Sequence, residues 1–249
     1  MSRHAKEHYE HHLARFYSWM VGDFEDACRC AETHYEAIKL PAGNGRLAID
    51  LGCGHGVHTI PIAKRGYETL AIDSSDFLLR ELESLNNDLP IRAINDDLLS
   101  FARHLDGRSA FLIACMGDTI THMESTVQVE SLFHDVAANL SSQGLFTISF
   151  RDYANHELTG TDRFIPVRSD ENRIHVCFLE YQHNIVLVHD ILHERDNGND
   201  WRMSVSHYPK IRLAASQLLQ FGEQVGLVLK NQYQKQGMCF MTFSKLNSA

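Results

Sequence analysis

Short apolar runs alternate with longer amphipathic segments between residues 47 and 150. The apolar runs at 47–51, 67–72, 91–94, 110–115 and 145–150 predict strands. The segments 57–65, 76–86 and 125–140 repeat their apolar residues at helical spacing and predict helices. Buried strands connected through helices are typical of a parallel sheet that is covered on both faces. The pattern therefore predicts an α/β core.

The period changes after residue 160. Four extended stretches, 163–167, 173–182, 185–195 and 201–208, are separated by short polar turns and predict an antiparallel β meander. A helix ending near Val225 follows, and then a hairpin formed by 227–233 and 239–243. The meander is therefore expected to be inserted between the fifth strand and the last helix.

Two further helices are expected ahead of the first strand, over residues 5–20 and 24–40. The first carries an aromatic cluster that includes Tyr17 and Trp19. These rings either form a lid over a bound ligand or pack in the core, and the sequence favours neither interpretation. The expected organisation has three parts: a helical lid (1–44), a core (45–159 and 211–249) and an inserted β subdomain (160–210) that lies over the binding site of the molecule that the protein acts on, its acceptor.

A glycine-rich turn follows the first strand, with the sequence Asp50-Leu51-Gly52-Cys53-Gly54-His55-Gly56. Glycine lets the backbone turn tightly and approach a ligand closely. The second strand ends about 20 residues later at Asp73, the position of the acid that binds ribose hydroxyls in nucleoside sites. The combination predicts a nucleoside cofactor.

The spacing of the glycines discriminates between cofactors. Dinucleotide sites use G-x-G-x-x-G, whereas this turn reads G-x-G-x-G with Asp50 two residues ahead of the first glycine. That carboxylate would repel a pyrophosphate but could accept hydrogen bonds from an ammonium group. A nicotinamide-dependent oxidoreductase is therefore the disfavoured alternative.

The turn resembles the D-x-G-x-G-x-G motif of class I S-adenosylmethionine-dependent methyltransferases. The resemblance covers residues from about 45 to 160 and from 211 to the end. It implies a Rossmann-like, seven-stranded, mostly parallel sheet with helices on both faces and an antiparallel last strand at the end of the sheet. It also implies S-adenosyl-L-methionine as cofactor, with Asp50 near its methionyl part and Asp73 on its ribose.

Further cofactor contacts are implied by the same resemblance. An acid after the third strand commonly binds the adenine amino group in this family. Asp96 and Asp97 both fit, with a slight preference for Asp97 because it directly precedes the apolar Leu98, which would lie against the ring. The remaining expected cofactor contacts are Gly52, Cys53, Gly54, Ser74, Cys115, Met116, Tyr17 and Trp19.

Two strand ends carry the candidate chemistry. Cys115-Met116-Gly117-Asp118-Thr119 with His122 resembles the C-x-G-N-S-x-x-H segment of glycine N-methyltransferase-like enzymes, and Arg151-Asp152-Tyr153 resembles their R-N-Y. His122, Tyr153 and Asp118 are the candidates for a base, and His122 is equally suited to positioning the substrate. Arg151 is a candidate acceptor contact, or it forms an ion pair that fixes its loop.

The meander adds two candidate substrate contacts, His175 and Tyr181. We expect His175, Cys177, Leu179 and Tyr181 to share one face with His189, Ile191 and His193. That face would either line a polar acceptor pocket or lie in solvent.

Composition narrows the possible partners. The chain is 44% hydrophobic and 22% charged, with a net charge of -9, which argues against a nucleic-acid substrate. The apolar runs are too short for a membrane span. The polar first residues and six scattered cysteines predict a cytoplasmic protein without a signal peptide.

We expect no metal, because neither His4, His8, His11 and His12 nor Cys28, Cys30 and His34 match a zinc spacing. A homo-oligomer is compatible with the sequence.

The leading functional hypothesis is methyl transfer from S-adenosylmethionine to a nitrogen or oxygen nucleophile of a small molecule. The methyl donor is already activated, so the protein mainly aligns the nucleophile and excludes water. The alternative from a different class is a regulatory or inactive methyltransferase-like protein that binds S-adenosylmethionine or S-adenosylhomocysteine. The sequence does not name the acceptor.

Overall fold

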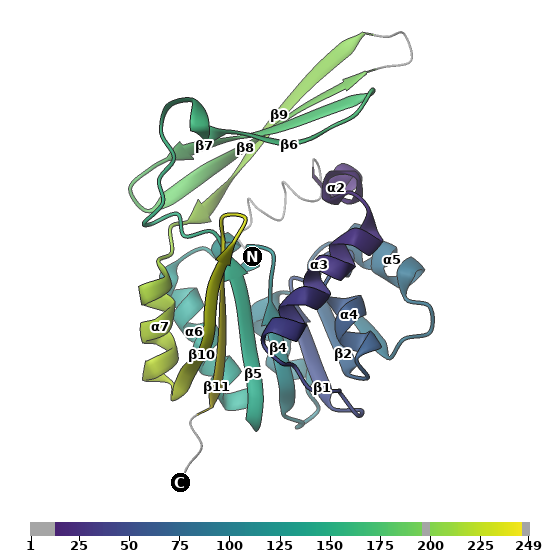
Figure 1. Ribbon diagram of the computed structural model, residues 1–249, viewed down its shortest axis with the longest axis vertical. Helices are drawn as coiled ribbons and strands as arrows, with labels where there is room; N and C mark the ends of the chain where they lie inside the picture. Colours follow the sequence, from purple (N-terminus) through teal and green to yellow (C-terminus); the bar gives the residue numbers. More distant parts are fainter. Residues whose placement is uncertain (1–12, 196–199, 246–249) are drawn as a thin grey trace.

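A computed structural model describes residues 13–195 and 200–245. Its larger sheet has seven strands in the order β10-β11-β5-β4-β1-β2-β3 (Figure 1). The strands are β1 Leu47–Leu51, β2 Glu68–Asp73, β3 Ile91–Asn95, β4 Ala110–Cys115, β5 Leu140–Phe150, β10 Leu227–Lys235 and β11 Met238–Lys245. Pairing is parallel from β3 to β5, and β11 runs antiparallel to β5. This architecture confirms the predicted fold class.

The expected position of the last strand is wrong. β11 does not end the sheet but lies between β5 and β10, so β10 forms the edge. The reason lies in the side chains of the hairpin. β11 carries the buried Cys239, Met241 and Phe243, whereas β10 exposes Lys230 and Gln232. The apolar strand takes the interior place and leaves the polar strand at the edge.

Helices cover both faces of this sheet. One face is covered by α3 Phe24–Ala37, α4 Thr59–Lys64 and α5 Asp76–Leu85, and the other by η2 Leu98–His104, α6 Thr126–Asn139 and α7 Ala215–Gln224. β1 is buried throughout because its side chains alternate between these layers. Ile49 packs with α6 on one side, and Ala48 packs with α3 on the other. The glycine turn therefore leaves a fully buried strand.

Two local features of the core differ from the expectation. β5 begins at Leu140, five residues before the predicted start, and takes in the segment 141–144 that looks like a turn in the sequence. An irregularity in the pairing with β4 falls there, between Ala110↔Leu140 and Leu112↔Leu145. The short 3-10 helix η2 was also not predicted; Asp97 caps its first turn.

A second sheet lies above the first in Figure 1. It is the predicted antiparallel meander, with strands β6 Phe164–Ser169, β7 Arg173–Tyr181, β8 Ile185–Arg195 and β9 Trp201–Ile211. Its inner face carries His175, Cys177, Leu179 and Tyr181, as expected, but His189 and His193 lie on the outer face. In the register, His189 is opposite Phe178 and contacts Glu180, on the face opposite to Cys177. The shared face expected for these histidines is wrong.

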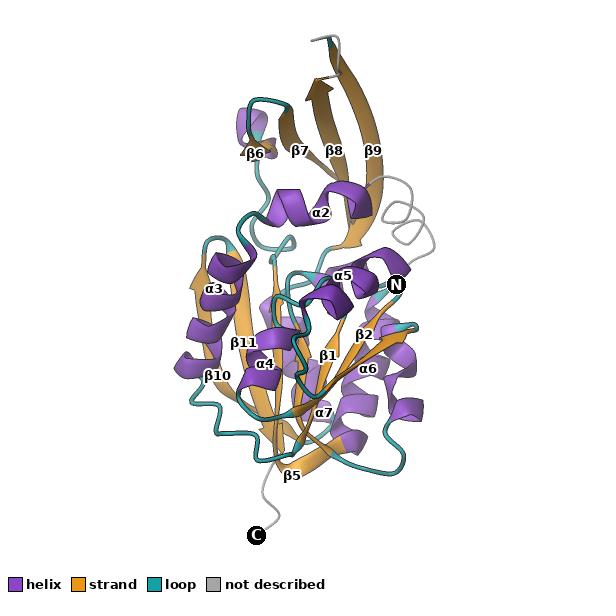
Figure 2. Ribbon diagram, turned by 90° about the vertical axis from the view of Figure 1, so that its right-hand side faces the viewer, coloured by secondary structure: helices purple, strands orange, loops and turns teal. Residues whose placement is uncertain are grey.

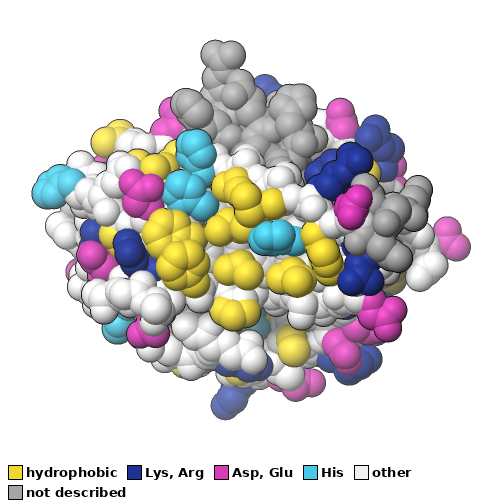
Figure 3. Space-filling model, turned by 90° about the horizontal axis from the view of Figure 1, so that it is seen from above, with side chains coloured by type: hydrophobic (Ala, Val, Ile, Leu, Met, Phe, Trp, Pro, Cys, Tyr) yellow, Lys and Arg dark blue, Asp and Glu magenta, His cyan; other side chains and the backbone are white. Residues whose placement is uncertain are grey.

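The outer face of the meander is rich in apolar side chains. Seen from above, hydrophobic side chains gather in its centre with histidines among them (Figure 3). Phe164, Ile174, Trp201, Met203 and Val205 are exposed on this face, and the rings of His189 and His207 lie 5.3 Å apart.

Helix α2, Ala14–Val21, lies between the meander and the core (Figure 2). Trp19 donates its indole N–H to Asp170 in the β6–β7 turn at 2.5 Å. Phe16 meets His175 of β7 edge to face, with ring centroids 5.4 Å apart. Residues 5–12 of the predicted first helix lie outside the described residues. Within the described ranges, no helix has both the length and the apolar character needed to cross a bilayer.

Candidate active site

The glycine turn and Asp73 join the ends of β1 and β2. Gly54 donates its backbone N–H to one carboxylate oxygen of Asp73 at 2.9 Å, and Ser75 donates its own to the other oxygen at 2.9 Å. Asp73 is buried, and burial raises the pKa of its carboxyl although these hydrogen bonds oppose the shift. Each oxygen keeps further lone pairs, so the carboxylate can still accept a ligand hydroxyl.

Gly52 brings β1 against the end of β4. Its φ is +71°, and a Cβ at this position would lie 2.3 Å from Cγ2 of Thr119. Both the backbone conformation and the contact therefore require glycine. Thr119 in turn donates its hydroxyl to the Met116 carbonyl at 2.7 Å. The first glycine of the motif thus allows two neighbouring strand ends to meet.

Asp50 lies beneath this turn and is 1% exposed. Thr59 donates its hydroxyl to the carboxylate at 2.7 Å. Burial raises the pKa of Asp50 to about 7; the Thr59 hydrogen bond opposes the rise, and the charge of Asp73 adds to it. A positively charged group bound nearby would favour the ionised form.

A cavity opens above the turn. Its lining comes from the glycine turn, the end of β2, the end of β4 and helix α2: Tyr17, Gly52, Cys53, Gly54, His55, Val57, His58, Asp73, Ser74, Ser75, Leu78, Met116, Gly117, Thr119 and His122. A Cβ on Gly54 would point toward the Tyr17 ring, 3.7 Å away. The cavity has a volume of about 70 Å³ in this conformation, so its residue types rather than its free space match a nucleoside cofactor. Close backbone, a carboxylate at the end of β2 and apolar walls are the groups that S-adenosylmethionine would need.

The structure brings most of the predicted cofactor residues to this cavity, but not all. Asp96 is held by Arg103 and His104, and Asp97 caps η2 through the Leu99 N–H at 2.9 Å. Leu98 and Cys115 are buried in the core, and Trp19 points to the meander. These five residues, together with Asp50 beneath the turn, are absent from the cavity wall in this conformation.

Asp118 is the centre of a buried network. Its carboxylate accepts hydrogen bonds from the backbone N–H of Arg151 at 2.9 Å and from the hydroxyl of Tyr153 at 3.3 Å, and it forms an ion pair with Lys210 of β9. The pKa of Tyr153 is raised by burial and by the Asp118 charge. A carboxylate with three donors and a phenol that donates to it are poorly suited to taking up a proton. This geometry favours a positioning role for both residues.

His122 has a different environment. It is buried at the wall of the cofactor cavity and stacks on Tyr208 of β9, with ring centroids 5.2 Å apart and planes inclined by 14°. Of the three predicted base candidates, it is the one that lines this cavity. The imidazole therefore lies between the cofactor cavity and the meander.

A second cavity adjoins the first. It has a volume of about 260 Å³ and shares Val57, His58 and Gly117 with the cofactor cavity. Its other walls come from α3, from the end of β5 and from the β10–β11 hairpin. Sequence reasoning missed this cavity, because its walls come from segments as far apart in the chain as Ala27 and Phe240, and only packing brings them together.

Two histidines give the second cavity its polarity. His34 contacts the Tyr233 hydroxyl through Nδ1 and the Thr147 hydroxyl through Nε2, each at 2.8 Å. Burial lowers the pKa of His34 to about 4 and that of His58 to about 3. Both imidazoles are therefore neutral at pH 7. A neutral ring has one acceptor nitrogen. Because both nitrogens of His34 already have partners, His58 is the ring that could accept a hydrogen bond from a substrate amine or hydroxyl.

The predicted substrate residues separate into two places. Arg151, Tyr153 and Tyr181 line a third cavity of about 280 Å³ between the end of β5, the meander and the terminal hairpin. His175 is buried in the meander with Asp190 and lines none of the three cavities. The structure therefore does not bring His175 together with Arg151 and Tyr181.

Comparisons with known proteins agree with this geometry. A family model described as a methyltransferase domain matches residues 48–144. The chain is 28% identical over 120 residues to the cypemycin N-terminal methyltransferase of a Streptomyces species, and the match covers 48% of this chain and 47% of that protein. It is 26% identical over 118 residues to the glycine/sarcosine/dimethylglycine N-methyltransferase of Actinopolyspora halophila, over 46% of this chain and 21% of that protein.

A solved structure extends the similarity to almost the whole fold. The sugar N-methyltransferase KedS8 of Streptoalloteichus matches with a TM-score of 0.71 at 15% identity, over 94% of this chain and 92% of that chain. The curated matches themselves span about half of one relative and about a fifth of the other.

The sheet order and the glycine turn define a Rossmann-like fold of the class I methyltransferase type. Residues 48–144 match a methyltransferase domain, and the chain is similar to known methyltransferases in this part of its sequence and in its overall fold. The predicted resemblance to methyltransferases is confirmed, including the partial likeness to glycine N-methyltransferases.

Proposed function

We propose that this protein transfers a methyl group from S-adenosylmethionine to a nitrogen or oxygen atom of a small molecule. The observation that carries the proposal is the junction between the two cavities at Val57, His58 and Gly117. A donor above the glycine turn and an acceptor in the second cavity would meet there. A cavity of about 260 Å³ suits a small molecule.

The cofactor would be held by the groups that surround the glycine turn. Asp73 would accept the ribose hydroxyls, Asp50 would balance the positive charge of the methionyl part, and Tyr17, Ser74 and Met116 would close the walls. When bound, S-adenosylmethionine supplies an activated methyl group. The protein contributes orientation and the exclusion of water.

His58 contributes the polar side chain at the junction of the two cavities. Its Nδ1 and the Tyr35 hydroxyl share a hydrogen bond of 3.0 Å, which fixes the ring. In the tautomer that donates Nδ1–H to the Tyr35 hydroxyl, the neutral Nε2 of this low-pKa ring is a hydrogen-bond acceptor for the nucleophile rather than a strong base. A neutral amine fits such a site because it needs only orientation and an unprotonated lone pair. The amine-methylating relatives support a nitrogen acceptor.

The test is turnover with a panel of amino acids, amino sugars, other small amines and phenols. We expect formation of S-adenosylhomocysteine together with an acceptor that has gained one methyl group. The matched variants are His58→Asn, which should reduce turnover, and His134→Asn on the exposed surface of α6, which should not. Tight binding of S-adenosylhomocysteine without any methylated product would instead support the regulatory alternative.

A further inference from the structure

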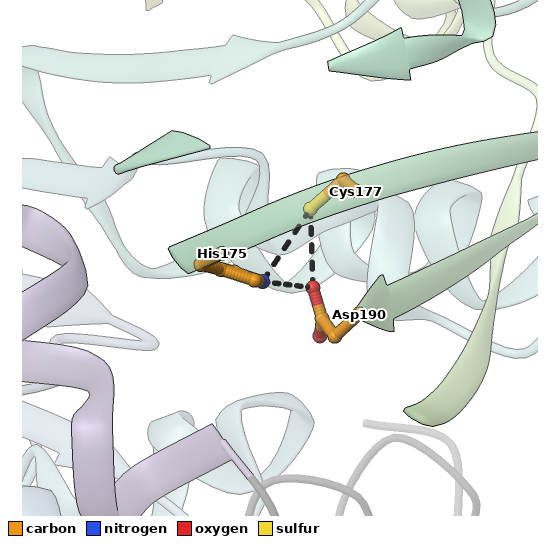
Figure 4. A group of neighbouring side chains, drawn as sticks. All are labelled: His175, Cys177 and Asp190. Carbon is orange, nitrogen blue, oxygen red and sulfur yellow. Dashed lines mark hydrogen bonds and ion pairs between the residues drawn. The ribbon is translucent and has the colours of Figure 1, made fainter. Parts of the chain in front are cut away.

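Three potential metal ligands meet on the inner face of the meander. His175 and Cys177 lie two residues apart on β7 and therefore point to the same face. Asp190 of β8 lies directly opposite Cys177 in the register. Figure 4 shows the three side chains directed toward one another. The group lies outside the cavities described above and has no role in the proposed methyl transfer.

The ligand atoms form a compact triangle. The distance from His175 Nε2 to Asp190 Oδ1 is 2.9 Å, that from Cys177 Sγ to the same oxygen is 3.1 Å, and that from Cys177 Sγ to His175 Nε2 is 3.8 Å. Ordinary zinc–ligand bond lengths in a tetrahedron place such atoms about 3.4–3.6 Å apart. Shifts of a few tenths of an ångström would therefore seat a zinc ion between them.

The surroundings hold the ligands in place. The side chains of His175 and Asp190 are 0% and 2% exposed, and both are carried by strands in the middle of the meander. Phe16 of α2 packs its ring against His175. Within the described residues, Nδ1 of His175 has no hydrogen-bond partner, so the polar contacts of this ring are made through Nε2. Rigid, buried ligands are what a metal site requires.

The chemistry of the donors selects the metal. An imidazole nitrogen, a cysteine sulfur and one carboxylate suit zinc, whereas magnesium and calcium prefer oxygen ligands. With a thiolate and a carboxylate, a divalent ion would leave the buried group without net charge, and binding would release the thiol proton to solvent. We propose that His175, Cys177 and Asp190 form a zinc-binding site with three protein ligands and a fourth position for water or an exogenous ligand.

The sequence could not show this site. The spacing from His175 to Cys177 is common in strands, and Asp190 becomes a neighbour only through the β7–β8 register. The two clusters weighed in the sequence do not form it. His4, His8, His11 and His12 lie outside the described residues, and Cys28, Cys30 and His34 are on α3. The predicted absence of a metal thus rested on different residues.

The test uses the full-length protein, purified without a metal-affinity tag and reconstituted with cobalt(II) or zinc(II). We expect one tightly held zinc per chain by elemental analysis after gel filtration. Cobalt should give the ultraviolet charge-transfer band of a cobalt–thiolate bond, which histidines alone cannot produce. Cys177→Ser and Asp190→Asn should lose the band and the bound zinc. Cys30→Ser, at an exposed cysteine of α3, is the matched control and should keep both.

Two results would overturn the proposal. One is folded wild-type protein that holds no zinc and shows no thiolate band, which would leave His175 and Asp190 as a metal-free hydrogen-bonded pair. The other is a band that persists in Cys177→Ser, which would place the metal on another cysteine. Circular dichroism of each variant verifies folding, and Cys177→Ala provides a second substitution if the serine variant does not fold. Neither result depends on methyl transfer, so this test is separate from that of the proposed function.

Discussion

Lys210 and Asp118 form a buried ion pair although 92 residues separate them in the chain. Lys210 lies near the end of the last meander strand, and Asp118 follows the fourth core strand. Their side chains are 9% and 5% exposed. The pair therefore connects the meander to the core immediately beside the cofactor cavity.

Removing one member of this pair is expected to destabilise the protein strongly. In Lys210→Met the carboxylate of Asp118 stays buried without its cation, and such a change costs about 3–5 kcal/mol. Chemical denaturation monitored by circular dichroism measures the loss. Lys230→Met, at an exposed lysine of β10, should change stability by less than about 0.5 kcal/mol. Adding Asp118→Asn to Lys210→Met should recover part of the loss, and strict additivity of the two single changes would argue against the pairing.

Asp73→Asn is expected to weaken cofactor binding at least tenfold. The amide keeps one acceptor oxygen for the turn but removes the charge and one of the two acceptors that face Gly54 and Ser75. Isothermal titration with S-adenosylhomocysteine gives the affinity. Glu83→Gln on the exposed surface of α5 is the control and should bind as the wild type does. An unchanged affinity in Asp73→Asn would remove the ribose assignment.

The raised pKa of Asp50 predicts how the stability of the protein depends on pH. The pKa of its carboxyl is raised from 3.8 to about 7 in the folded protein, so folding favours the protonated form. The contribution of Asp50 to stability is complete below about pH 4 and is lost as the pH rises through about 7. Asp50→Asn should therefore reduce the decline in unfolding free energy between pH 5 and pH 8. A pH profile identical to that of the wild type would show that Asp50 ionises as an exposed acid does.

The raised pKa of Asp50 also predicts that the affinity for the cofactor increases with pH. A cationic cofactor near Asp50 stabilises the carboxylate, so binding releases a proton wherever the free site is still protonated. S-adenosylmethionine affinity should increase between pH 6 and pH 8, and Asp50→Asn should flatten this dependence. Titrations in buffers of different ionisation enthalpy count the released protons directly. Proton uptake, rather than release, would contradict the assignment.

Gly52→Ala is expected to cost about 2–4 kcal/mol, combining a left-handed backbone with overpacking. The new methyl group would meet Thr119, whose Cγ2 lies 2.3 Å from the Cβ position. Thr119→Ala removes that obstacle, so the same glycine change should cost less in its background. Unfolding free energies of the four proteins of this cycle give the coupling. A coupling of zero would show that backbone conformation alone selects glycine at position 52.

The sequence predicts the fold where the signals are local. The parallel strands are short runs rich in apolar residues, mostly buried except in the edge strand β3, so all five appear in the sequence. The position of β11 and the early start of β5 at Leu140 depend on partners elsewhere in the sheet. Neither alternation nor turn residues carry that information. The segment at 141–144 has turn chemistry, yet the strand runs through it, because β4 pairs with Leu140 before it and with Leu145 after it.

In the candidate site, too, the residues that the sequence predicts are those with a local signal. The glycine turn and Asp73 are recognisable because one backbone geometry requires their residue types at fixed spacing. His34, His58 and Lys210 were missed because their environment comes from remote segments, such as Tyr233 beside His34. The acid after β3 shows that a residue can fit a sequence motif and still have a different role in the structure. Asp97 fits the family position, yet in this structure its carboxylate caps η2.

The mouth of the second cavity has a consequence for the size of the acceptor. Among its lining residues, Cys30 of α3 and Lys235 and Gln236 of the β10–β11 hairpin are exposed, so the entrance lies on the flank of the core. The meander is connected to the rest of the protein by the Lys210–Asp118 ion pair on one side and by the hydrogen bond from Trp19 to Asp170 on another. An acceptor that enters from the flank would break neither of these two contacts. In the proposed reaction, only the reactive end of the acceptor would need to pass between α3 and the hairpin, while a bulky remainder would stay in water.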